Sequence, residues 1–100
     1  MSIIYVQIAR ERLRQEELKK EGRFRYTCAD MEMTHADKAT VLVEEVGEVC
    51  GAVIQLAGIG TDRPNADLRK ELLHVAAVAV AWIESIDKEA EYGKKTTAAP

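Results

Sequence analysis

The chain has 100 residues, of which 47% are hydrophobic and 31% are charged, and its formal net charge is −3. These values indicate one small globular domain and argue against a disordered chain or a dedicated nucleic-acid-binding protein. The longest nearly apolar run, residues 72–83, is too short to span a bilayer, and the N-terminus lacks the features of a signal peptide. We therefore expect a cytoplasmic protein with no membrane or nucleic-acid partner, whose modest core favours self-association.

The first helix is predicted over residues 4–21, where charged side chains surround a thin apolar stripe through Ile4 and Ile8. Gly22 is the predicted stop, because glycine readily adopts the left-handed conformation that ends helices. Residues 23–33 follow without clear hydrophobic periodicity, so the sequence predicts a loop before the second helix.

The second helix is predicted to begin after Thr34 and to end near residue 58 or 60. Thr34 and Asp37 have nearly the spacing of a capping box, with the carboxylate at the positive end of the helix dipole. Gly47 and Gly51 lie four residues apart and share one face, where we expect another helix or a ligand to approach closely. Cys50, between them and the valines, is interpreted as a small core residue.

The third helix is predicted to begin near Asn65 or Asp67, either of which can cap it, and to end near Gly93. Its middle is apolar on nearly every side, which indicates burial all round, within one subunit or between subunits. The prediction is therefore an all-α helical bundle of three main helices in one domain, residues 1–93, completed as a dimer or tetramer. Residues 94–100 are predicted to form a disordered tail.

Carboxylates interrupt the valine-rich second helix, where Glu44, Glu45 and Glu48 fall within a sector of about 100°. Two ionised carboxylates about 4 Å apart repel by roughly 4 kcal/mol at an effective dielectric near 20, so such a face needs solvation, protonation or a cation. On the third helix Glu71 and His74 also share a face. If the two helices pack antiparallel, three or four of these groups converge on one cleft, as in the metal sites of helical bundles. Carboxylate-rich sites suit Mg²⁺, with Mn²⁺ as an alternative.

The order and spacing of these residues resemble a known family. EEVGE at residues 44–48, followed after 22 residues by ELLH at residues 71–74, is similar to the EExxE…ExxD signature of MazG-like, all-α nucleoside triphosphate pyrophosphohydrolases. The resemblance covers residues from about 38 to 87. It implies a MazG-like fold and a Mg²⁺-dependent hydrolysis of a nucleoside triphosphate to a monophosphate and pyrophosphate, in which a bound water attacks the α-phosphorus.

Carried over by position, the resemblance implies a role for each acidic residue. Glu45, Glu48 and Glu71 are implied as metal ligands, and Glu44 as a further ligand or water-positioning group, so the expected catalytic residues are Glu44, Glu45 and Glu48. The chain departs from the pattern at His74, where the family has Asp. Imidazole is a poor ligand for Mg²⁺ but a fair one for Mn²⁺ or Zn²⁺. His74 is therefore a fourth candidate ligand, and a base or phosphate-contact role or a weakened enzyme stays open.

Substrate phosphates also need cationic side chains. Lys70 lies beside Glu71, Arg23 and Arg25 flank a phenylalanine in the predicted loop, and Lys38 precedes the acidic motif. Each of these four residues is a candidate substrate-binding residue, although a surface cation is more often simply solvated.

Two other functions stay open at this point. Glu71 and His74 match one Glu-x-x-His half of a di-iron helical bundle, and a homodimer would supply the second half. Alternatively, the chain is a degenerate MazG-like module that acts through its surface without catalysis. Iron oxidation would identify the first alternative. In the second, removal of a carboxylate would raise stability without loss of metal binding.

Overall fold

Three helices and no strand make up the part of the chain that the computed structural model describes, which is residues 2–58 and 67–97, the last four as backbone alone. The helices are α1 (Ile3–Lys20), α2 (His35–Leu56) and α3 (Leu68–Thr97). The all-α prediction is confirmed. In none of the helices does the described sequence provide an apolar span long enough to cross a membrane.

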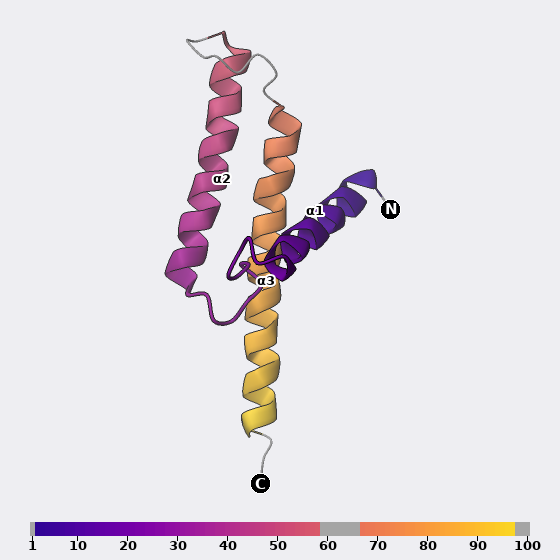
Figure 1. Ribbon diagram of the computed structural model, residues 1–100, viewed down its shortest axis with the longest axis vertical. Helices are drawn as coiled ribbons and strands as arrows, with labels where there is room; N and C mark the ends of the chain where they lie inside the picture. The colour runs from indigo at the N-terminus through magenta and orange to yellow at the C-terminus, as the bar shows by residue number, and fades with distance from the viewer. Residues whose placement is uncertain (1, 59–66, 98–100) are drawn as a thin grey trace.

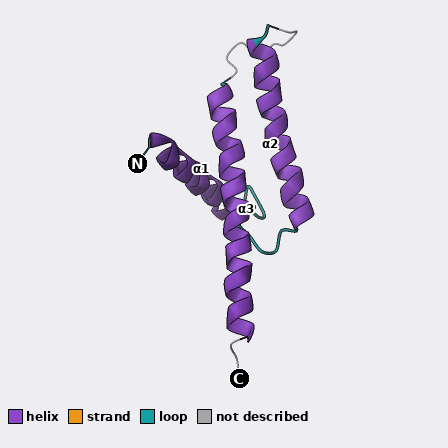
Figure 2. Cartoon of the chain, turned by 180° about the vertical axis from the view of Figure 1, so that it is seen from behind, coloured by secondary structure: helices purple, strands orange, loops and turns teal. Residues whose placement is uncertain are grey.

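The longest helix, α3, is the centre of the arrangement and contacts both other helices. Figure 1 shows α2 running antiparallel to the N-terminal half of α3, while α1 crosses α3 near its middle. The C-terminal part of α3 extends beyond both partners, and Figure 2 shows the same extension from behind. The molecule is accordingly elongated, with extents of 63 × 32 × 24 Å and a radius of gyration of 16.5 Å, where a compact chain of this length has about 13 Å.

Capping side chains fix the N-termini of α2 and α3. The backbone N–H of Asp37 donates to Oγ1 of Thr34 at 3.1 Å, which confirms the predicted cap of the second helix. At the start of α3 the backbone N–H of Lys70 donates to Oδ1 of Asp67 at 3.0 Å. Asp67 is therefore the capping residue, and Asn65, the alternative, lies outside the described residues.

Glycine ends two helices but does not end the third. Gly22 and Gly58 have φ angles of +80° and +72°, and α1 and α2 end two residues before them, at Lys20 and Leu56, so both predicted stops are confirmed. Residue 60, the other predicted stop, is outside the described range. Gly93 has no positive φ, and α3 continues past it to Thr97, so the predicted end at Gly93 is wrong. A glycine within a helix costs only about 1 kcal/mol, which the continuing backbone hydrogen bonds of a long helix tolerate.

The buried apolar core is small and built from short side chains. α3 contributes three buried residues that allow the neighbouring backbones to come close, and the loop before α2 contributes two more. The buried apolar residues are Cys28, Ala29, Ala52, Ala77, Val78 and Ala81. Larger apolar side chains of α3 remain open, since Leu72 is 50% and Ile83 is 56% exposed. The burial predicted on every side of this helix is therefore not completed within one chain.

α2 carries apolar residues on two opposite faces. The face toward α3 contains Ala52, whereas the outer face contains pairs seven residues apart, which is the spacing of one helix face. These outer residues, all exposed, are Val43 and Cys50, Val46 and Val53, and Gly47 and Ile54. Cys50 is thus not a core residue of the single chain. A Cβ built on Gly47 or Gly51 would have no described atom within 4 Å, so the expected close approach does not occur within this chain.

Polar contacts hold α1 and α2 against α3. Nη2 of Arg12, a buried residue of α1, lies 2.8 Å from Oε2 of Glu16 and 2.8 Å from Oε2 of Glu84 on α3. On the other side of α3, the fully buried Nζ of Lys38 donates to Oγ of Ser85 at 2.6 Å. Both contacts join residues distant in sequence, so they fix where the helices cross.

Candidate metal centre

The antiparallel packing of α2 on α3 brings together three of the four predicted ligands. One ligand atom from each of Glu45, Glu71 and His74 lies within 4.8 Å of the others. Nδ1 of His74 is 3.5 Å from Oε2 of Glu71, its neighbour one turn earlier on α3. The same Nδ1 is 3.8 Å from Oε2 of Glu45 on α2. We call these three residues the acidic cluster.

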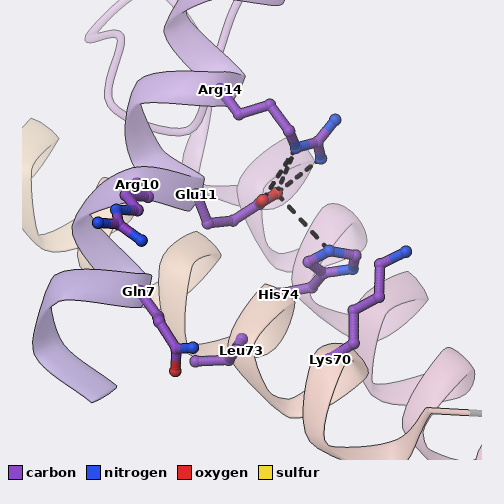
Figure 3. A pocket seen from close by; sticks show the side chains of 7 residues that line it. All are labelled: Gln7, Arg10, Glu11, Arg14, Lys70, Leu73 and His74. Carbon is purple, nitrogen blue, oxygen red and sulfur yellow. Dashed lines mark hydrogen bonds and ion pairs between the residues drawn. The ribbon is translucent and has the colours of Figure 1, made fainter. Parts of the chain in front are cut away.

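A third carboxylate reaches His74 from α1, because α1 crosses α3 near this point. Oε1 of Glu11 lies 3.8 Å from Nε2 of His74, and Figure 3 shows the Glu11 side chain between the His74 ring and the guanidinium of Arg14. Sequence reasoning missed Glu11. Its only local signal is the three-residue spacing from Arg14, which is common on solvated helices.

Burial and like charge act together on Glu45. Burial raises the pKa of this carboxyl, and repulsion from Glu71, Glu48 and Glu11 adds to the increase, while His74 opposes it. For Glu11 the balance is the reverse. Burial alone would raise its pKa, but hydrogen bonds and charge from Arg14, with help from His74 and Lys70, lower it. The charge of Glu45 is therefore less well compensated by its neighbours than that of Glu11, which Arg14 pairs with directly.

The donor set fits a small divalent cation. Carboxylate oxygens suit Mg²⁺ and Mn²⁺, and one imidazole favours Mn²⁺. Two atoms bound to one ion at about 2.1 Å lie at most about 4.2 Å apart, so the cluster, with its 4.8 Å limit, has to close only slightly. The three side chains would then leave further coordination positions of the cation for water or phosphate oxygens.

The two remaining predicted acidic residues lie outside this group. Glu48 follows Glu45 by one turn on α2 and is exposed, although its charge still acts on Glu45. Glu44 is also exposed on the same helix. The structure thus brings Glu45 to α3 and leaves Glu44 and Glu48 at the solvent side of α2.

Of the predicted substrate-binding cations, Lys70 alone lines the pocket beside the cluster. Arg23 lies in the exposed loop after α1, where its Nε is 3.7 Å from Oε2 of Glu21. The guanidinium of Arg25 lies over the ring of Tyr26, 5.4 Å from the centroid. Lys38 shares the face of Glu45 on α2, but its side chain is fully buried and bonded to Ser85. None of these last three side chains reaches the cluster.

Sequence reasoning also missed two arginines near the cluster. Arg10 and Arg14 of α1 line the same pocket as Lys70, between α1 and α3. A stripe of alternating charge on a helix usually indicates solvation, and only the docking of α1 turns this stripe toward His74.

Comparison with protein-family models, with curated proteins and with solved structures yields no match to this chain. The MazG-like resemblance therefore rests on the sequence pattern alone.

Proposed function

We propose that the chain is a divalent-cation-dependent nucleoside triphosphate pyrophosphohydrolase of the MazG-like type. The observation that carries this proposal is the convergence of Glu45 with Glu71 and His74 from two antiparallel helices. Glu45 of the EExxE-like segment and Glu71 of the ExxD-like segment are 26 positions apart in the sequence, and a cation bound between them would offset the repulsion between their carboxylates. Their repulsion otherwise opposes folding.

In this proposal Glu45 and Glu71 hold the cation, with His74 completing the side of the site that faces α1. When bound, a divalent cation neutralises phosphate oxygens and lowers the pKa of a bound water. We assign Glu44 and Glu48, exposed on the same helix as Glu45, the proposed roles of holding the attacking water and accepting its proton. Lys70 supplies positive charge toward the phosphate chain.

His74 sets the expected choice of metal. Because imidazole nitrogen is a softer donor than the Asp oxygen of the family pattern, we expect Mn²⁺ to support turnover better than Mg²⁺. The biological role that we propose is removal of surplus or unwanted nucleotides.

The test is pyrophosphate release from a panel of standard and modified nucleoside triphosphates, with Mg²⁺ or Mn²⁺. Glu45→Gln should lower turnover by at least about 100-fold, because it removes a ligand charge. Glu17→Gln, at an exposed position of α1, is the matched control and should leave turnover unchanged. Absence of turnover with every nucleotide and metal would contradict the proposal, and iron oxidation would then be measured for the di-iron alternative.

We also propose that a second copy of the chain covers the outer face of α2. This face exposes Val43 at 69%, Val53 at 49% and Ile54 at 45%. Large apolar patches that stay exposed on one chain often mark a protein–protein contact. Sedimentation should find a dimer or a tetramer, and Val46→Asp should dissociate it, whereas Glu17→Gln should not. A wild-type monomer at micromolar concentration would contradict the proposal.

A further inference from the structure

A pocket of about 250 Å³ lies between α1 and α3, directly beside the acidic cluster. It is lined by Gln7, Arg10, Glu11, Arg14, Lys70, Leu73 and His74. Three of these side chains are cationic and one is a carboxylate, although the whole chain has a net charge of −3. The pocket therefore concentrates positive charge in an acidic protein, which favours an anionic occupant.

An internal carboxylate already occupies the best anion-binding group of this pocket. The Arg14 guanidinium donates from Nε to both oxygens of Glu11, at 3.1 and 2.9 Å, and from Nη2 to Oε1 at 2.6 Å. Such a forked contact is the one that arginine offers to carboxylates and phosphates alike. The Arg14 side chain is 55% exposed, whereas that of Glu11 is 13% exposed, so the guanidinium can turn toward an incoming ligand while Glu11 stays in place.

Two further side chains of the pocket act on the same carboxylate. Figure 3 shows Lys70 beside the His74 ring, whereas Arg10 points away from Glu11. Lys70 and His74 both act electrostatically on Glu11, together with Arg14. An anion between Arg14 and Lys70 would therefore compete directly with Glu11 for Arg14.

We infer that this pocket binds phosphate oxygens of a polyphosphate through Arg14 and Lys70, and that Glu11 is a built-in competing anion that the ligand displaces from Arg14. The inference rests on the proposed function for the identity of the ligand. It adds two residues of α1 that lie outside the acidic motif. Arg14 attracts the phosphate chain, and Glu11 limits the affinity for it. Glu11 also keeps Arg14 neutralised when the pocket holds no ligand, so the arginine does not collapse onto Glu45, whose charge acts on it from α2.

The test is calorimetric binding of inorganic pyrophosphate at low ionic strength in EDTA, which requires neither a cation nor turnover. Glu11→Gln should tighten binding by about tenfold, because Arg14 loses a charge-assisted partner. Arg14→Gln should weaken binding by about tenfold, and Arg14→Lys should restore it only in part, because lysine keeps the charge but lacks the fork. Lys20→Gln, at an exposed position at the end of α1, is the control and should bind as the wild type does.

Each result separates this inference from the proposed function. Pyrophosphate binding with the expected order of variants would support the pocket even if no nucleotide were hydrolysed. Equal affinity in the wild type and Glu11→Gln, or no binding by any variant, would overturn the inference even if the hydrolysis assay succeeded. Circular dichroism of each variant distinguishes lost binding from lost folding.

Discussion

Among the residues that the structure describes, two clusters of ionisable groups join the helices, and they differ in how fully charge is matched. Around Arg12, one guanidinium reaches Glu16 and Glu84 at 2.8 Å each. Around His74, three carboxylates approach one imidazole at 3.5–3.8 Å. The first set of distances is that of charge-assisted hydrogen bonds, and the second lies at or beyond the outer limit of hydrogen bonding.

The difference separates a structural site from a candidate functional one. Thr27 adds a hydrogen bond from Oγ1 to Oε2 of Glu16 at 2.8 Å, so the Arg12 cluster has matched donors and acceptors. The acidic cluster has excess negative charge on Glu45 and Glu71, and its groups are spaced widely enough to admit an ion. Carboxylates that lie close together without hydrogen-bond donors therefore indicate a ligand site more strongly than carboxylates that share a guanidinium.

The largest expected effect on stability comes from Arg12→Met. It removes the shared guanidinium and leaves Glu16 and Glu84 facing each other across α1 and α3. We expect the free energy of unfolding to fall by about 2 kcal/mol, because the carboxylates are only partly buried and regain water. Urea unfolding is the measurement, and Arg14→Met, which removes a guanidinium that is 55% exposed, should change stability by less than about 1 kcal/mol. Equal effects of the two variants would remove the distinction between the clusters.

His74→Asp tests whether the imidazole is a metal ligand in the acidic cluster. It replaces the imidazole with a fourth carboxylate and restores the ligand of the family pattern. Relative to the wild type, the ratio of turnover with Mg²⁺ to turnover with Mn²⁺ should rise by about tenfold, because an all-oxygen donor set suits Mg²⁺. A ratio that does not change would show that His74 is not a ligand.

Glu45→Gln should raise stability when no divalent cation is present. The amide keeps the shape of the side chain and removes the repulsion from Glu71 and Glu11, so we expect a gain of about 0.5–1 kcal/mol in EDTA. Glu84→Gln, in the matched cluster, should have the opposite sign. Thermal unfolding with and without Mn²⁺ gives the second readout, since cation stabilisation should be lost only in Glu45→Gln. Destabilisation by Glu45→Gln in EDTA would mean that this cluster, too, is internally satisfied.

The smallest expected effect is the pH dependence carried by Glu16. Burial alone would raise the pKa of Glu16, but hydrogen bonds from Arg12 and Thr27 and the charge of Arg12 lower it below its ordinary value. A lowered pKa in the folded state contributes stability above the ordinary glutamate pKa, about 4.3, and this contribution is lost as the pH falls through the folded value. Glu16→Gln should therefore lower stability slightly at pH 7 and have no effect at strongly acidic pH. A difference that persists in acid would assign the effect to packing.

Local signals in the sequence predicted the helices well. The cap at Thr34 and the stops at Gly22 and Gly58 depend on neighbouring residues alone, and all three are as predicted. The end at Gly93 was wrong, because a glycine ends a helix only if its φ turns positive, and the residue type does not determine this.

The candidate site was predictable where two helix faces determine it. Three-residue spacing and antiparallel packing were enough to bring Glu71 and His74 to Glu45. Glu11 was not predictable, because its approach depends on the angle at which α1 crosses α3. The burial of Lys38 was not predictable from local sequence either. Its burial depends on Ser85, 47 residues later in the chain, and no local pattern distinguishes it from a solvated lysine.

The hydrogen bond between Lys38 and Ser85 also has a consequence for the alignment of α2 with α3. The small alanine and valine side chains of this interface pack similarly in neighbouring registers, so apolar packing alone would permit α2 to slide along α3. A slip of one turn, about 5.4 Å, would leave the buried Nζ of Lys38 without Ser85, which costs about 1–3 kcal/mol. Because Lys38 precedes Glu45 by two turns on the same face, one buried amine selects the register in which a carboxylate of α2 stands level with the imidazole of α3.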